Sequence, residues 1–141
     1  MNNETDYLAL AAPFAGDAPA GVDVSSTDEF EQINEELLKA EGLNIQAIEW
    51  DKIERLSVAT LAEQSKDLKV AGYLLVALYE QYGFKGLATG LQLFGDMVNA
   101  DYWPSLYPAR KSVKKQNKAR AASFAWAVFR IDRVLKTFEV D

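Results

Sequence analysis

Few side chains of this 141-residue chain could carry out nucleophilic or acid–base chemistry, because the sequence contains neither histidine nor cysteine. Their absence excludes disulfides, thiolate nucleophiles, imidazole general bases and the usual zinc ligands. Serine, lysine and carboxylate groups remain. Much of the enzymatic repertoire is therefore excluded, and we expect neither a cofactor nor a bound metal.

The segment Ser65-Lys66-Asp67-Leu68 places a serine, a lysine and a carboxylate next to one another. A lysine can act as the base for a serine nucleophile. However, the same residues come directly before an apolar helical pattern, where a serine or aspartate usually caps a helix. We therefore interpret this segment as the start of a helix.

Acidic side chains offer a second route to catalysis, since a hydrolase can work with two carboxylates. Two acidic pairs fall on one helix that is rich in acids, which is typical of a solvated surface: Glu35 with Glu36, and Asp28 with Glu31. A small helical hydrolase using Glu63, Asp67 and Glu80 stays an alternative. It would require at least two carboxylates that converge in an apolar pocket with displaced pKa values.

Charge is distributed unevenly along the chain. Residues 1–101 contain 18 acidic and 6 basic side chains, whereas residues 102–141 contain 3 acidic and 9 basic ones. The basic residues crowd together at Arg110, Lys111, Lys114, Lys115, Lys118 and Arg120. They could bind phosphate groups, but the net charge of -6 repels a polyanion at long range. We expect this basic stretch either to neutralise the acidic half of the same fold or to bind an acidic protein partner, and we expect no nucleic acid.

The motif Tyr102-Trp103-Pro104-x-Leu106-Tyr107-Pro108 precedes this basic block and combines aromatic side chains with two prolines. A rigid aromatic loop of this kind is typical of interaction hot spots. We expect Trp103 to fold back onto the bundle and Tyr107 to be exposed. The predicted partner-binding residues are Tyr102, Trp103, Tyr107, Arg110, Lys111, Lys114 and Lys115.

Helices must position these side chains, because apolar residues recur at intervals of three and four along most of the chain. A capping box at Ser26 and Glu29 predicts a helix over about 27–40, and Asp51 predicts the cap of a second one. The expected core stripes of the later helices are Leu68, Ala71, Leu75, Leu78 and Tyr82; Leu87, Leu91, Phe94 and Val98; and Phe124, Val128, Ile131, Leu135 and Phe138, with Trp126 beside the last.

A helical hairpin is predicted around Gly83, which is placed to end the third helix, and Gly86, which would let the chain reverse. No segment alternates as a strand does. The sequence therefore predicts an all-α fold: an irregular N-terminal arm over 1–25 and a single helical bundle of about five main helices over 26–141. The longest uncharged apolar stretches are shorter than the roughly 20 residues that span a bilayer, and no signal peptide is evident, so we expect a cytoplasmic protein without membrane insertion.

Several motifs occur in a specific order. They are Ser65-Lys66-Asp67-Leu68, Leu75-x-x-Leu78, Gly83-Phe84-Lys85-Gly86-Leu87, Gly90-Leu91 and Tyr102-Trp103-Pro104-x-Leu106-Tyr107-Pro108. In this order they resemble the N-terminal domain of the ImpA/TssA proteins, accessory components of the bacterial type VI secretion system. The resemblance runs from Pro19-x-Gly21-x-Asp23 to Arg120-Ala121-x-x-Phe124-x-Trp126, but Val24-Ser25-Ser26-Thr27 stands where such proteins commonly have an Arg-Tyr pair.

The resemblance implies a non-catalytic module of a longer cytoplasmic protein that contacts the baseplate and helps to assemble the tail tube and sheath. Ring formation in the family belongs to a C-terminal region, so we expect this chain alone to be a monomer or a weak small oligomer. The resemblance does not identify the baseplate or tail protein that is bound. A helical adaptor unrelated to secretion is a further alternative, besides the hydrolase.

Overall fold

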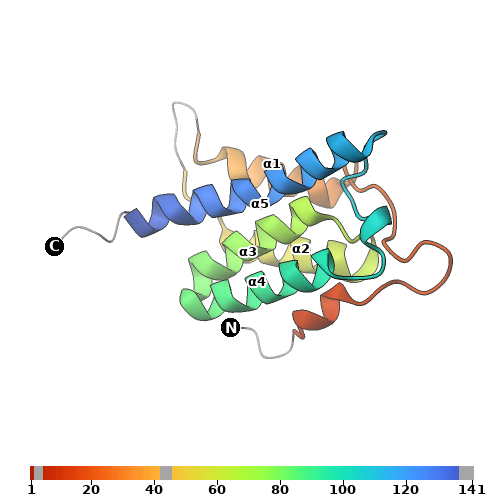
Figure 1. Ribbon diagram of the computed structural model, residues 1–141. Helices are drawn as coiled ribbons and strands as arrows, with labels where there is room; N and C mark the ends of the chain where they lie inside the picture. The colour runs from red at the N-terminus through yellow and green to blue at the C-terminus, as the bar shows by residue number, and fades with distance from the viewer. Residues whose placement is uncertain (2–4, 42–45, 137–141) are drawn as a thin grey trace.

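The described residues form five α-helices and two short 3-10 helices (Figure 1). The computed structural model describes residue 1, residues 5–41 and residues 46–136, the last three of these by their backbone alone. In chain order the elements are η1 (Leu8–Ala11), α1 (Asp28–Leu38), α2 (Trp50–Glu63), α3 (Leu68–Tyr82), α4 (Phe84–Val98), η2 (Trp103–Ser105) and α5 (Val113–Lys136). The described residues form no strand, only two isolated bridges, so the predicted all-α class is confirmed.

The centre of the fold is α3, on which α2, α4 and α5 all pack (Figure 1). Every residue from Val70 to Tyr79 is buried, so this helix is covered on all sides. The sequence pattern predicted a single apolar stripe, which was too narrow. A helix that is apolar all round belongs in the middle of a bundle. None of the described helices combines the length and the apolar character that a bilayer-spanning segment requires.

The start of α3 was predicted correctly, because the Asp67 side chain accepts hydrogen bonds from the backbone N–H groups of Lys69 and Val70 at 2.7 and 3.3 Å. The start of α1 was placed one residue too early. Thr27, not Ser26, is the N-cap, and its Oγ1 accepts from the Phe30 N–H at 3.3 Å. This happens because Thr27 is the last residue with extended backbone geometry.

Two further expectations about helix ends need correction. Asp51 lies inside the first turn of α2 and is not its N-cap, which is Glu49. Gly83 ends α3 as predicted, with a positive φ of 67°, and α4 begins at the next residue. Gly86 lies within α4, where a Cβ atom would overlap the Leu78 carbonyl, so its role is close helix packing. The end predicted for the first helix at Gly42 lies outside the described residues.

The apolar stripes predicted for the last two helices are only partly buried. In α4, Leu91 is 41% exposed and Val98 is also exposed, while Phe94 is buried. In α5, Phe124 and Val128 are exposed and only Ile131 of that stripe is buried. The side chain of Leu135 and all of Phe138 lie outside the described residues. The prediction of a buried stripe was therefore wrong for four large side chains.

The reason lies in the contact between α3 and α5, which uses small residues. A Cβ atom on Gly72 of α3 would lie 3.1 Å from the Ser123 carbonyl oxygen of α5, so the two backbones approach closely there. Ser123 and Ala127 are buried in this contact. Trp126 is half-buried and meets the Tyr73 ring edge-on at 5.0 Å. Close approach selects small side chains for the buried face and leaves the larger ones of α5 outside.

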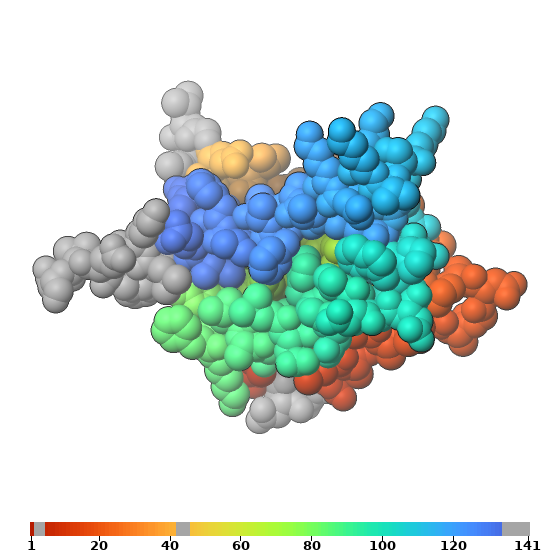
Figure 2. Space-filling model, viewed as in Figure 1, coloured from red at the N-terminus to blue at the C-terminus, as the bar shows by residue number. Residues whose placement is uncertain are grey.

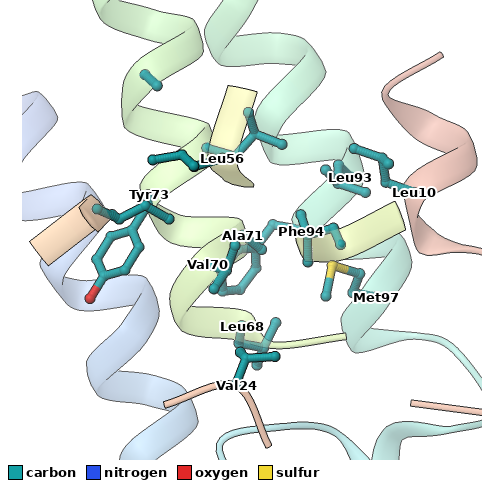
Figure 3. Packing of buried hydrophobic residues seen from close by; sticks show 14 of the residues in the cluster. Leu10, Val24, Leu56, Leu68, Val70, Ala71, Tyr73, Leu93, Phe94 and Met97 are labelled. Atoms are coloured by element: carbon teal, nitrogen blue, oxygen red, sulfur yellow. The ribbon is translucent and has the colours of Figure 1, made fainter. Parts of the chain in front are cut away.

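The N-terminal arm takes part in the main core. Tyr7, Leu10, Ala20 and Val24 are buried in the same cluster as residues of α2, α3 and α4. Figure 3 shows Leu10 beside Leu93 of α4, and Val24 close to Leu68 at the start of α3. The described part of the arm is thus held on the bundle by apolar contacts.

Lys66 fastens this arm to the bundle although its side chain is fully buried. Its Nζ donates to the Leu10 carbonyl at 2.6 Å and to the Leu61 carbonyl at 2.7 Å, and it lies 4.2 Å from the centre of the Phe14 ring. Burial lowers the pKa of Lys66 to about 8, because it disfavours the charged ammonium. One lysine therefore joins the end of η1 to the last turn of α2.

We expect Lys66→Met to lower the free energy of unfolding by about 1.5 to 3 kcal/mol at pH 7, because two buried carbonyls lose a charged donor. In the parent protein, the Lys66 side chain binds fewer protons in the native state than in the unfolded chain between about pH 8 and 10.5. The contribution of Lys66 to the free energy of unfolding should therefore rise with pH across that window, and the Lys66→Met variant should lack this rise.

Urea denaturation at several pH values measures both effects. Lys85→Met, which removes the charge of an exposed lysine in α4, is the control and should change stability little. If Lys66→Met were as stable as the parent protein, the arm would not depend on this side chain.

Candidate functional site

The loop between α4 and α5 contains the aromatic residues predicted to bind a partner, and the structure gives them different roles. Tyr102 is buried, and its hydroxyl donates to the Ala11 carbonyl at 2.7 Å. Burial raises the pKa of Tyr102 to about 12, so this hydroxyl stays protonated and keeps donating. Tyr102 therefore holds the loop against the N-terminal arm and has little surface to offer.

Trp103 is half-buried and stacks on a guanidinium group. The Arg120 Cζ atom lies 4.0 Å from the centre of the Trp103 ring, and its Nη2 donates to the Leu106 carbonyl at 3.1 Å. Leu106 itself is fully buried. The expectation that Trp103 folds back onto the bundle is thus met, and Arg120, from the first turns of α5, contacts both Trp103 and Leu106.

Tyr107 continues the loop along the start of α3. Its N–H donates to the Lys66 carbonyl at 3.1 Å, and its own carbonyl accepts from the Leu68 N–H at 2.8 Å. The Tyr107–Pro108 peptide bond is cis. Tyr107 is partly buried against the core, so more of it is covered than the sequence suggested, but part of it still faces solvent.

The predicted basic residues do reach the surface together. Exposed side chains at the end of the loop and the start of α5 are Arg110, Lys111, Lys114, Lys115 and Lys118. Among the described residues, none of these cations has a carboxylate within 4 Å, since the ion pairs found there join Glu36 and Glu49 to Lys39 and Lys52. We call these five residues the basic end of α5.

Next to the basic end of α5 is an apolar groove of about 540 Å³ that the sequence analysis missed. It runs between α4 and the first half of α5, two helices that pack on α3 far more than on each other. Figure 2 looks onto this face, with α4 in green and teal and α5 in blue. The residues lining the groove are Leu68, Leu91, Phe94, Gly95, Val98, Trp103, Asn117, Arg120, Ala121 and Phe124.

Five of the residues that line this groove had been assigned to the core, and three of them are exposed: Leu91, Val98 and Phe124. Their helical spacing was read correctly, but spacing alone does not say whether a neighbouring helix covers the stripe. A usable signal was present in α5, where Ser123 and Ala127 form a second stripe of small residues that competes for the buried side. Arg120 was grouped with the surface lysines, although it is buried.

The carboxylates considered for catalysis do not meet in one apolar pocket. Asp67 caps α3, and Glu80 lies near Arg130. Burial raises the pKa of both carboxyls, although the Lys69 and Val70 N–H groups at Asp67 and the positive charge of Arg130 at Glu80 act in the opposite direction. Glu63 lines a separate polar pocket of about 540 Å³ that neither of the other two lines. Within the described residues, no group of three acidic side chains is arranged to hold a metal ion.

The polar pocket at Glu63 also contains Glu54, whose carboxylate is a hydrogen-bond acceptor for three side chains. The Tyr7 hydroxyl donates to its Oε2 at 2.7 Å, and Gln81 Nε2 and the Tyr82 hydroxyl donate to its Oε1 at 2.8 Å each. These bonds join the arm, α2 and the end of α3. Glu54 therefore connects elements of the fold and is not poised as a free base.

Comparison with known proteins places the chain in a family. Residues 11–128 match the family described as ImpA, N-terminal, type VI secretion system. No match is found among curated proteins. A solved structure of the N-terminal domain, including the conserved ImpA_N region, of the TssA component of the type VI secretion system from Burkholderia cenocepacia has the same fold, with a TM-score of 0.74 at 24% sequence identity.

That comparison covers 89% of this chain and 47% of the Burkholderia chain, so this chain spans about half the length of that relative. The family match, in contrast, extends over most of the described helices, from η1 into α5. The chain therefore belongs to the ImpA N-terminal family of the type VI secretion system.

Proposed function

We propose that this chain is a non-catalytic protein–protein interaction module of a TssA-like protein, which acts in the bacterial cytoplasm and contacts baseplate or tail components during assembly of the tube and sheath. Membership of the ImpA N-terminal family supports a role in type VI secretion. The occupied carboxylate of Glu54 and the separate positions of Asp67 and Glu80 argue against the hydrolase alternative.

The observation that carries the choice of surface is the basic end of α5. Exposed cations with no carboxylate within 4 Å among the described residues gather there, on a chain whose net charge is -6, although Arg110 lies near enough to Asp23 to lower the pKa of that carboxyl. Lysines in the first turn of a helix also lie at the positive end of its dipole, which is unfavourable unless an anionic group approaches. An acidic patch on a baseplate or tail protein would supply such groups.

The aromatic loop complements this charge. Tyr107 keeps part of its ring in solvent, whereas Tyr102 and Trp103 hold the loop in place through Ala11 and Arg120. A ring on a fixed backbone loses little conformational freedom on binding and can fill a pocket on the partner. We therefore propose Tyr107 as the anchor and Arg110, Lys111, Lys114 and Lys115 as the steering charges.

Reversing Lys111, Lys114 and Lys115 to Glu should slow association with purified baseplate and tail proteins and reduce its dependence on salt, because steering by opposite charge acts mainly on the association rate. Tyr107→Ala should mainly speed dissociation, at a cost of about 1 to 3 kcal/mol in binding. Surface plasmon resonance at low and high salt separates the two effects, after circular dichroism has confirmed that each variant is folded.

Lys85→Glu is the control for charge, since Lys85 is exposed at the opposite end of α4 from the loop. It should bind like the parent protein. If the triple reversal and Tyr107→Ala also bound like the parent protein, the interface would have to be sought elsewhere, first on the acidic exposed face of α1.

A further inference from the structure

The groove between α4 and α5 has the shape and lining of a receptor for an apolar helix. Its walls expose large apolar side chains from both helices, Leu91 and Val98 on one side and Phe124 on the other. The Phe94 and Phe124 rings, one from each helix, also line it, with their centres 5.2 Å apart. Two parallel rows of apolar side chains with a gap between them are what an amphipathic helix fills when it binds in a groove.

A buried cation lines this otherwise apolar groove. Arg120 is 6% exposed, and its Nε has no hydrogen-bond partner. Among the described residues it also has no carboxylate within 4 Å, and its guanidinium is held only by the Leu106 carbonyl and the Trp103 ring. A buried charge without a counter-charge is costly, and an incoming carboxylate would lower that cost.

The rim of the groove adds more positive charge. Lys114, Asn117, Ala121 and Phe124 follow one another at intervals of three, four and three residues, which puts them along one face of α5. The lysine at the start of this row therefore lies on the side that carries the groove-lining residues. The charge that the groove and its rim present to an occupant is positive.

From these observations we propose that the groove binds an amphipathic α-helix of a partner protein, whose apolar stripe packs against Leu91, Val98 and Phe124 and whose carboxylates face Arg120 and Lys114. This inference deepens the proposed function by naming the chemistry of one partner segment. The groove shares Lys114 with the steering charges but does not include Tyr107, so a change at Phe124 and a change at Tyr107 test the two proposals separately.

Two other occupants fit less well. A second copy of this chain offers acidic residues on the exposed face of α1, but Leu38 is the one large apolar side chain exposed along the described length of that helix. An anionic membrane would match the lysines, yet lipid binding requires apolar side chains that protrude, whereas these line a hollow. Both are outcomes that the experiment can detect.

The probe is a synthetic helical peptide of about 18 residues, with leucines on one face and glutamates on the other, titrated into the ¹⁵N-labelled protein. We expect saturable shifts in the NMR spectrum that concentrate at the residues of α4 and α5 lining the groove. A peptide with lysines in place of the glutamates should bind at least about tenfold more weakly.

Phe124→Ser should weaken binding of the glutamate peptide by about tenfold or more, because the apolar wall is lost. Phe129→Ser is the matched control: the same change in the same helix, at a ring that is 65% exposed and does not line the groove, which should leave affinity unchanged. Val98→Lys on the opposite wall tests the groove again if Phe124→Ser proves unstable in a thermal melt.

The proposal is overturned if the glutamate peptide causes no localised shifts up to about 1 mM, or if the lysine peptide binds equally well. It is also overturned if the protein dimerises through the groove in ultracentrifugation, or if vesicles of anionic lipid, and not the peptide, bind in a way that Phe124→Ser abolishes. If the parent protein does not bind the peptide, while Tyr107→Ala still speeds dissociation from baseplate or tail proteins as expected, the groove is rejected and the proposed function stands.

Discussion

Leu75→Ala should lower the free energy of unfolding by about 3 to 5 kcal/mol, one of the two largest effects that we expect of a single change in this protein. Leu75 is fully buried at the contact between α3 and α4, where its Cδ1 would lie 2.5 Å from a Cβ atom at Gly90. Truncation removes this apolar contact and leaves a cavity that the close-packed helices cannot close. Urea denaturation followed by circular dichroism measures the loss.

Leu91→Ala is the matched control, because it removes the same atoms from the neighbouring helix at a side chain that is 41% exposed. It should cost less than about 1 kcal/mol. The sequence pattern alone treats the two leucines as equivalent. Equal losses at the two positions would mean that α4 is packed differently from the arrangement described above.

Gly86→Ala is expected to cost about 3 kcal/mol, at the upper end of what overpacking usually costs. A Cβ atom there would overlap the Leu78 carbonyl, and a backbone atom within a central helix cannot move aside as a side chain can. The helices α3 and α4 would have to separate. Thermal and urea denaturation should both report the change.

Gly95→Ala, in the same helix, should instead raise the free energy of unfolding. No atom lies within 4 Å of the Cβ position at Gly95, so alanine gains its better helix propensity, about 1 kcal/mol, without a clash. A stabilising effect at both glycines would show that the close contact between α3 and α4 is not required. A loss at both would show that chain flexibility in α4 matters more than packing.

Much of the fold follows from local features of the sequence. Asp67 caps α3 because a short acceptor side chain precedes a run of apolar residues, and Gly83 ends that helix because it can adopt a positive φ. Both features act over a few residues, so a single sequence contains them. The same holds for the number of main helices and for the absence of sheet from the described residues.

The direction in which each helix buries its side chains depends on its neighbours and could not be predicted in the same way. In α5, Phe124 belongs to the more hydrophobic stripe, but Ser123 belongs to the stripe that lets this helix approach Gly72. The closeness of the contact between α3 and α5 decides which stripe of α5 is buried, and this closeness depends on the side chains of both helices. The same tertiary effect buries Lys66, which sequence reasoning had left in a helix cap motif.

Within the candidate site, it was the charged residues whose exposure could be predicted from the sequence. The lysines of the basic end of α5 are exposed as expected, because long charged side chains are rarely buried without partners. The groove beside them was missed, since it exists where α4 and α5 fail to cover each other. Tyr102 was expected at the surface of an aromatic loop but is buried by the N-terminal arm, from which it is separated by most of the chain.

The segment between α2 and α3 joins the N-terminal arm to the loop between α4 and α5. The Lys66 N–H donates to the Ala20 carbonyl of the arm at 2.7 Å, and the Lys66 carbonyl accepts from the Tyr107 N–H at 3.1 Å. During synthesis the arm leaves the ribosome first, yet it cannot complete this junction until the residues around Tyr107 have been made. Contacts between such distant residues close large loops and form late in folding. The arm is therefore among the last parts of this domain to reach its native place.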